Sequence, residues 1–175
     1  MFRLTESPRL SEFERQVLPH LDAAYNLARF LMRNDHDAED VVQEAALRAF
    51  RFFESFRGEN SRAWFLRIVR NTSFTALKRH HTNEGNVVFD EELHGVENPP
   101  MDAGVVLDRA QDRQTVRAAI EQLPAEFREV ITLRELEEFS YKEIADIAGV
   151  PIGTVMSRLA RGRRQLQMIL NPEAK

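Results

Sequence analysis

The most informative side chains of this sequence are hydroxyls and guanidiniums near its C-terminus. Residues 152–170 have the 3.6-residue period of a helix. One face of this helix would carry Thr154, Ser157, Arg161 and Arg164, with Arg158 beside them. Arginine can donate two hydrogen bonds to guanine, and serine or threonine can reach bases or phosphates. The pattern favours a helix that reads the major groove of DNA. A basic helix that is merely solvated, or that binds an acidic partner, is the alternative.

The residues before this helix favour a helix-turn-helix. Ser140 and Glu143 have the spacing of a capping box at the start of a short helix, and Gly149 suits its C-terminal cap. A short helix, a tight turn and a longer second helix make up the unit. The second helix should end at Asn171–Pro172, and its packing face should consist of Val155, Leu159, Gly162, Leu166 and Ile169.

A second cationic helix is predicted over residues 61–80, with Ser61 as its N-cap. The stripe expected to be buried is Phe65, Ile68, Val69, Thr72 and Ala76, and the opposite face is Arg67, Arg70, Asn71, Phe74 and Lys78. Cations hold a phosphate backbone while aromatic rings stack on unpaired bases, so this face suits accessible bases. The preceding loop adds Phe56, Arg57 and Asn60. The alternative is a solvated basic helix with Phe74 covered by a neighbour.

The helix predicted over residues 37–54 combines a leucine with charges on its outer face. That face consists of Asp40, Gln43, Glu44, Leu47, Arg48 and Arg51, and the packing stripe of Val42, Ala45, Ala46, Ala49 and Phe53. An apolar centre with a polar rim is typical of a protein-binding surface. Single exposed leucines are nevertheless common on protein surfaces.

Helical periods of this kind recur along most of the chain, so the predicted fold class is all-α. Two small helical domains, 9–81 and 108–170, are joined by an acidic flexible linker, and the second contains the helix-turn-helix. Glycines, the Pro99–Pro100 pair and acids mark the linker over 82–107. It could extend to roughly 85 Å and would average about 28 Å as a coil. The domains could then engage sites far apart.

Charge is distributed unevenly along the 175 residues, although the net charge is only −4. Residues 57–81 hold six Lys or Arg and one Glu, and residues 151–175 hold five and one. Residues 82–107 hold six acids without Lys or Arg, and residues 35–44 hold five. Two basic blocks separated by acidic ones suggest two phosphate-facing surfaces. Solvated helix faces of mixed sign would give the same counts.

The composition also excludes several classes of protein. Cysteine is absent, so disulfides and thiolate metal sites are excluded. The sequence has no apolar run of about 18 residues and no apolar signal core at its start, so membrane insertion and secretion are not expected. We therefore expect a cytoplasmic protein without a cofactor.

Three segments in series resemble the extracytoplasmic-function (ECF, group IV) sigma factors of the sigma-70 family. DAEDVVQEAALRAF resembles the part of sigma domain two that grips the clamp helices of the largest RNA polymerase subunit. FRGENSRAWFLRIVRNTSFTAL resembles the promoter-melting part of that domain. LPAEFREVITLRELEEFSYKEIADIAGVPIGTVMSRLARGRRQL resembles sigma domain four. The resemblance covers about residues 10–170.

The resemblance implies three partners: core RNA polymerase, promoter DNA and a separate anti-sigma factor. It implies that the polymerase-binding residues are Asp40, Gln43, Glu44 and Leu47. Residues 56–60 would receive a flipped base of the −10 element, with Asn71 and the basic helix nearby. The −35 duplex would be read through Thr154, Met156, Ser157, Arg158 and Ala160, and the acidic linker would follow the polymerase channel later used by RNA.

One departure from the family and three rival functions remain. Met156 stands where family members often carry arginine, and methionine cannot donate to guanine, so we expect the −35 preference to differ or to rest on Arg158. A repressor or activator with a helix-turn-helix would leave the first 80 residues without a role. A purely protein-binding adaptor would not bind promoter DNA. An enzyme is disfavoured, because the acids around His36 begin a helix and are explained by its dipole.

Overall fold

Every regular element in the described part of the chain is a helix, which confirms the all-α prediction. The computed structural model describes residues 8–83 and 109–172. The N-terminal domain contains α1 (Pro8–Val17), α2 (Leu21–Met32), α3 (Asp35–Phe52) and α4 (Ser61–Asn83), with 3₁₀ turns η1 (Leu18–His20) and η2 (Phe53–Ser55). The C-terminal domain contains α5 (Arg109–Glu121), α6 (Ala125–Ile131), the π-helical turn η3 (Thr132–Leu136), α7 (Tyr141–Ala148) and α8 (Ile152–Leu170). The predicted linker lies outside the described residues, except for Thr82 and Asn83, which continue α4.

Side-chain caps begin α3 and α4. The Asn34 side chain accepts a hydrogen bond from the Asp37 amide at the start of α3. The predicted N-cap at Ser61 is wrong, because Asn60 caps α4 one residue earlier. Its Oδ1 accepts from the Ala63 amide at 2.9 Å and its carbonyl accepts from Trp64 at 3.1 Å, so Ser61 is already helical.

The N-terminal domain packs α2, α3 and α4 against one another. Small side chains on α3, namely Ala38, Ala45 and Ala49, are fully buried and allow the helices to approach closely. The buried stripe lies slightly off the predicted one. Val41 is buried, whereas Val42, Ala46 and Phe53 are half-buried at the margin of the core.

The C-terminal domain holds the predicted helix-turn-helix. The capping box of Ser140 and Glu143 is formed in both directions, and Gly149 closes α7 with a φ of +68°. On α8, Val155, Leu159 and Gly162 are buried as predicted, with Leu166 and Ile169 half-buried. Gly162 is required by a close approach: a Cβ there would lie 3.1 Å from Ile131 Cγ1 and 3.3 Å from Phe127 Cβ of α6.

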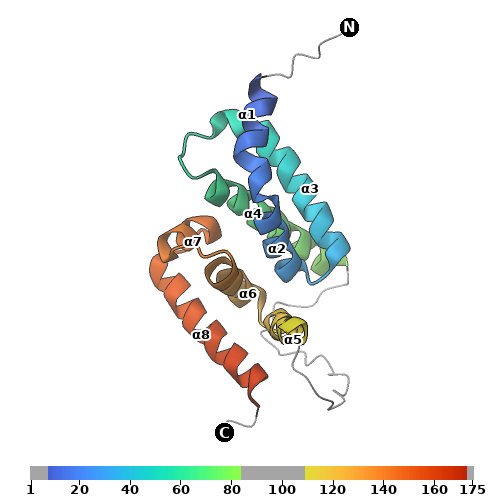
Figure 1. Ribbon diagram of the computed structural model, residues 1–175, viewed down its shortest axis with the longest axis vertical. Helices are drawn as coiled ribbons and strands as arrows, with labels where there is room; N and C mark the ends of the chain where they lie inside the picture. The colour runs from blue at the N-terminus through green and yellow to red at the C-terminus, as the bar shows by residue number, and fades with distance from the viewer. Residues whose placement is uncertain (1–7, 84–108, 173–175) are drawn as a thin grey trace.

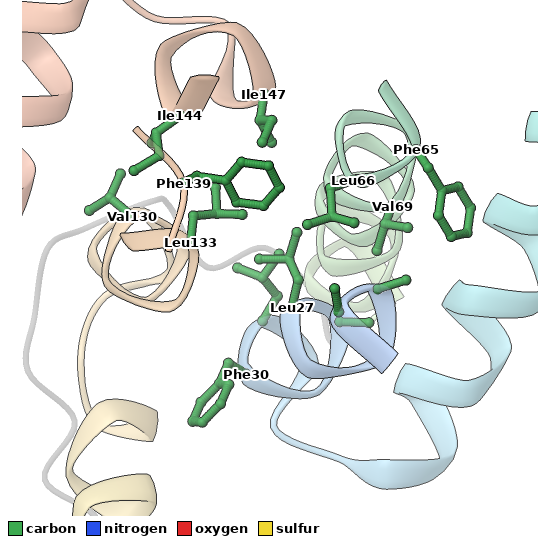
Figure 2. Packing of buried hydrophobic residues seen from close by; sticks show 14 of the residues in the cluster. Leu27, Phe30, Phe65, Leu66, Val69, Val130, Leu133, Phe139, Ile144 and Ile147 are labelled. Carbon is green, nitrogen blue, oxygen red and sulfur yellow. The ribbon is translucent and has the colours of Figure 1, made fainter. Parts of the chain in front are cut away.

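The two domains share one hydrophobic core instead of having two separate ones. Figure 1 shows α6 and α7 lying against the N-terminal helices, and α6 contacts α2 while α7 contacts α4. In Figure 2, Leu66 of α4 and Leu27 of α2 lie opposite Leu133 and Phe139. Leu66, which was not predicted to be buried, is fully buried because α4 packs on two sides. No helix in residues 8–83 or 109–172 is long and apolar enough to cross a bilayer.

The contact between α8 and α6 predicts a stability effect at Gly162. We expect Gly162→Val to lower the free energy of unfolding by about 1–3 kcal/mol, because the branched side chain collides with Ile131 and Phe127. Chemical denaturation would measure the effect. Gly153→Ala is the matched control, since its Cβ meets nothing within 4 Å. Equal stability of Gly162→Val and the wild type would show that the helices can separate without cost.

Candidate nucleic-acid and polymerase interfaces

The first half of α8 presents an apolar stripe to solvent, followed by cations. Ile152 is 45% exposed and Met156 is 53% exposed, and Ala160 is exposed one turn later at the same four-residue spacing. Arg161 and Arg164 follow and are also exposed. The face predicted to meet the −35 duplex is thus open, but its first turns are apolar. Ile152 was not among the predicted residues, although its four-residue spacing from Met156 could have identified it.

Other predicted −35 residues form contacts within the C-terminal domain. The Arg158 guanidinium lies 3.3 Å from Glu126 and 3.9 Å from Glu129 on α6, and its side chain is only 20% exposed. Ser157 and Thr154 are half-buried, and the Ser157 hydroxyl donates to the Thr154 carbonyl at 3.0 Å. Arg158 must leave these carboxylates, or share them, in order to reach a base.

An aromatic cluster supports the loop between α3 and α4. Phe56 stacks on Phe53 at 6.4 Å between ring centroids and lies 5.0 Å from Trp64, and Phe53 also contacts Phe13. Arg57 donates to the carbonyls of Glu54 and Phe56, which holds the loop compact. A shallow hollow forms beside the loop. Its lining comes from Ser55, Phe56, Arg57, Gly58, Glu59, Asn60, Ala63, Trp64, Arg67, Asp146 and Ile147.

The predicted nucleic-acid face of α4 continues from this loop. Arg67, Asn71 and Lys78 are exposed, as the helical period predicted. Phe74 is half-buried, and the Arg70 guanidinium lies 4.2 Å from its ring centroid. The seven predicted −10 residues therefore lie on one domain, spread along the loop and α4.

Helix α3 carries two exposed apolar side chains, Leu47 and Phe52. Leu47 is 62% exposed beside exposed Asp40 and Gln43, while Glu44 pairs with Arg48 along the helix. Phe52, at the end of the helix, is 60% exposed and was missed by the helical stripe. Positions five apart lie on different sides of a helix, so Phe52 is a second exposed apolar side chain of α3 and not part of the face of Leu47.

The sequence did not predict that the C-terminal domain covers part of the cationic face of α4. Arg70 Nε donates to Glu129 Oε1 at 2.6 Å, Arg62 Nη2 donates to Glu137 Oε2 at 2.8 Å, and Asn60 Nδ2 donates to Glu143 Oε1 at 2.8 Å. A signal for this contact exists in the sequence, because residues 121–146 contain eight acids and three Lys or Arg. The acids complement the cationic helix.

Burial changes the acid–base properties of two groups at this domain contact. Glu129 is fully buried, and desolvation raises the pKa of its carboxyl, although Arg70 and Arg158 oppose the shift. Desolvation lowers the pKa of Arg128 to about 10, and its Nη2 donates to the Leu31 carbonyl of the other domain at 3.0 Å. Arg128 therefore stays charged at neutral pH, and its side chain connects the two domains.

The acidic cluster that begins α3 serves structural contacts. Asp35 accepts from Arg29 and Tyr25, and the hydrogen bond with Arg29 is the main cause that lowers the pKa of Asp35. His36 Nε2 lies 3.8 Å from Asp40 along the helix. Over the residues that the structure describes, no His, Asp and Glu side chains gather into a group that could hold a metal ion.

Comparison with known proteins agrees with the two-part organisation. The family model of Sigma-70 region 2 matches residues 17–82, and that of Sigma-70 region 4 matches residues 113–166. The ECF RNA polymerase sigma-E factor of Haemophilus influenzae is 37% identical over 153 residues, which covers 83% of this chain and 80% of that protein. The chain belongs to the ECF sigma factors of the sigma-70 family. It is therefore a non-enzymatic factor that directs transcription initiation.

Two solved structures match both domains of this sigma factor. The sigma factor RpoE from Bartonella quintana, crystallised with the anti-sigma factor NepR, aligns with a TM-score of 0.71 at 30% identity, covering 93% of this chain and 99% of that one. CnrH in complex with the cytosolic domain of CnrY aligns with a TM-score of 0.65 at 23% identity, covering 94% and 90%, which shows a shared fold.

Asn60 combines a structural role with its predicted role at the −10 element. We expect Asn60→Ala to lower the free energy of unfolding by about 1 kcal/mol, because the α4 cap is lost. Asn60→Ser should be more stable than Asn60→Ala, since a hydroxyl also caps and both variants lose the hydrogen bond to Glu143. Thermal unfolding of both variants checks this. Equal stabilities for the alanine and serine variants would contradict the capping role.

Proposed function

We propose that this sigma factor contacts core polymerase through α3 and promoter DNA through two separate surfaces. The proposal rests on one observation: three groups of exposed residues lie on three different parts of the structure. Leu47 and Phe52 lie on α3, the aromatic loop and Arg67 lie beside α4, and Met156 with Arg161 lies on α8. If the protein were a simple repressor, the first two groups of residues would have no role.

The polymerase surface is Asp40, Gln43, Glu44 and Leu47. An apolar centre rimmed by acids suits a helical partner with apolar and basic side chains. The clamp helices of the largest polymerase subunit are the partner that the family resemblance implies. Since the polymerase and its promoters are cytoplasmic, the sigma factor would act in the cytoplasm.

The −10 surface consists of the loop and α4: Phe56, Arg57, Asn60, Arg67, Asn71, Phe74 and Lys78. Its aromatic-lined hollow fits an unstacked base, and the exposed cations fit the backbone on either side. The −35 surface is α8, where Arg161 and Arg164 contact phosphates and the first two turns meet base edges. Thr154, Ser157 and Arg158 would contact the DNA only after they give up their present contacts inside the protein.

We also infer that a separate anti-sigma factor regulates this protein. The sigma factor RpoE of Bartonella quintana, which aligns along 93% of this chain at 30% identity, was crystallised with the anti-sigma factor NepR. Affinity isolation of the sigma factor from its native cells under non-inducing conditions tests this proposal. Recovery of core polymerase alone would contradict it.

Leu47 tests the polymerase surface. We expect Leu47→Asp to weaken binding to core polymerase at least about tenfold, because a charge replaces the apolar centre of the contact. The stability should change by less than about 0.5 kcal/mol, since the side chain is exposed. Core binding and run-off transcription on genomic fragments provide the measurements. Leu18→Asp, another exposed leucine, is the matched control and should transcribe normally; normal binding by Leu47→Asp would place the polymerase contact elsewhere.

Met156 tests the −35 surface and its specificity. The exposed side chains of Ile152, Met156 and Ala160 fit thymine methyl groups in the major groove. We expect Met156→Arg to shift one −35 position toward guanine, with discrimination of about 1–3 kcal/mol. Transcription from a promoter library randomised at the −35 element would measure the shift. Met168→Arg, at another exposed methionine near the end of α8, is the control. Unchanged −35 preferences for Met156→Arg would show that residue 156 does not contact a base.

A further inference from the structure

We propose that the N-terminal segment formed by α1 and η1 positions the 56–60 loop for capture of the −10 base, with Arg9 as the positioning residue. This segment, residues 8–20, is called the brace below. None of the three surfaces proposed above includes a residue of the brace. Its role rests on the proposed function of the loop, and it adds the element that fixes the shape of the loop before a promoter strand binds.

Arg9 connects the brace to the end of α3, where the loop begins. Its Nη2 donates a hydrogen bond to the Phe50 carbonyl at 2.8 Å, and its Nη1 lies 3.2 Å from Glu54 Oε1. The guanidinium also lies 4.8 Å from the centroid of the Phe50 ring. A cation is favourable at this end of a helix, because the last carbonyls carry partial negative charge. One side chain of the brace thereby holds both the last turn of α3 and the turn η2 that follows it.

A continuous set of aromatic rings leads from the brace to the loop. Phe13 of α1 is buried and meets the rings of Phe50 and Phe53 edge-on, with centroids 5.2 and 5.5 Å away. Phe53 stacks on Phe56 at 6.4 Å, and Phe56 lies 5.0 Å from Trp64 of α4. The position of Phe56, the first residue of the loop, therefore depends on rings that α1 holds in place.

The brace also contacts the other end of the loop. His20, the last residue of η1, places its Nε2 3.4 Å from the hydroxyl oxygen of Ser61, the first residue of α4. Burial lowers the pKa of His20, and Arg62 adds to the shift, so the imidazole is neutral at pH 7. A neutral imidazole can pair with a hydroxyl as donor or as acceptor. Both ends of the loop are thus held by one segment that lies outside the loop.

The internal hydrogen bonds of the loop do not replace the brace. Arg57 donates to the carbonyls of Glu54 and Phe56, and Asn60 caps the start of α4. Each of these bonds joins residues close together in the chain, so it fixes local curvature. Phe56 and Trp64 both line the hollow beside the loop, and they lie farther apart in the chain. Their mutual position depends on the packing of η2 against α4, which the brace supports.

The contacts of Arg9 require a planar guanidinium. A lysine ammonium is a single nitrogen, so it cannot reach the Phe50 carbonyl, Glu54 and the ring face from the positions that two nitrogens occupy. The Nε of Arg9 is buried and has no hydrogen-bond partner in the described residues. A buried donor without a partner costs free energy. The position of the side chain is therefore set by the contacts of its two terminal nitrogens and of the ring.

A fixed hollow matters because every group that must be ordered on binding lowers the affinity for the base. Without Arg9, the turn η2 and Phe53 can shift, and Phe56 loses the support that places it beside Trp64. The hollow would then hold the base less tightly and discriminate less between bases. The polymerase contact and the −35 contact are made by other elements, so they should not change.

Three variants test the role of the brace, and a fourth is the control. Arg9→Ala removes every contact of the guanidinium, Arg9→Lys keeps the charge, and Phe13→Leu keeps an apolar side chain without the ring contacts. Arg15→Ala is the matched control, because Arg15 is an exposed arginine of the same helix whose ion pair is with Glu12 of α1 itself. Circular dichroism establishes that each variant is folded.

Trp64 provides a readout of the loop that is independent of promoter binding. It is the single tryptophan of the sequence and lies half-buried beside Phe56. We expect emission at longer wavelength and stronger quenching by acrylamide for Arg9→Ala and Phe13→Leu than for the wild type and Arg15→Ala. Equal emission and quenching in all four proteins would overturn the link between the brace and the loop.

The promoter experiment removes single bases from the −10 element. Holoenzyme is reconstituted from core polymerase and the full-length sigma factor, and open-complex formation is measured on templates with an abasic site at each non-template position in turn. The captured base is the position where the abasic site weakens the wild type most. Because stacking of one base on an aromatic ring changes affinity at least about fivefold, we expect a loss of that size for the wild type and Arg15→Ala. For Arg9→Ala and Phe13→Leu we expect a loss of less than about twofold, since the hollow no longer holds the base firmly.

The outcomes distinguish failure of the brace from failure of the proposed function. If no abasic position affects the wild type, the proposed capture of a base fails, while the tryptophan emission still decides whether the brace positions the loop. If Arg9→Ala and Phe13→Leu are as sensitive as the wild type at the captured position, positioning by the brace is overturned. Wild-type behaviour of Arg9→Lys would overturn the need for a planar guanidinium. Weaker core binding or an altered −35 preference in the Arg9→Ala variant would show a general structural effect and overturn the positioning role.

Discussion

The buried carboxylate of Glu129 is the interaction on which the arrangement of the two domains depends. It is fully buried between Arg70 of α4 and Arg158 of α8, and one of its oxygens lacks a hydrogen-bond partner in the described residues. A charge in this position is stable only while its cations remain close, because desolvation otherwise favours the neutral acid. The carboxylate therefore fixes α4, α6 and α8 relative to one another.

Helix α4 packs against both domains, on two different faces. Phe65 and Val69 pack within the N-terminal domain, while Leu66 meets the apolar side chains of the C-terminal domain (Figure 2). Around this apolar centre run the ion pairs of Arg62 and Arg70 and the hydrogen bond of Asn60. An apolar centre with a charged rim is typical of contacts between domains that separate during function. Salt weakens the rim and leaves the apolar centre in place.

The two DNA-facing helices differ in how their cations are held. On α4, Arg67 and Lys78 are exposed, whereas Arg70 is engaged by the other domain. On α8, Arg161 and Arg164 are exposed, whereas Arg158 and Arg163 are held by carboxylates of α6 and η3. Counting basic residues in either helix thus overstates the charge available to phosphate. The exposed apolar stripe of α8 becomes more important to recognition as a result.

The sequence alone determined the main helices and several of their caps and outward faces, although it placed the cap of α4 one residue too late. The capping box at Ser140, the cap at Gly149 and the packing face of α8 were predictable because they depend on neighbours within four residues. The exposure of Leu47, Arg67 and Asn71 followed from the same period. The family followed from three segments in series.

The tertiary structure decided which of those outward side chains are free. Leu66, Arg70 and Arg158 belong to helices whose local pattern was read correctly, yet each is covered or paired by a residue from another element. Glu129 and Arg70 are 59 positions apart in the chain, on opposite sides of the acidic segment 82–107. Helical periodicity describes one helix at a time and contains no information about its partner. The packing of one domain on the other therefore had to come from the structure.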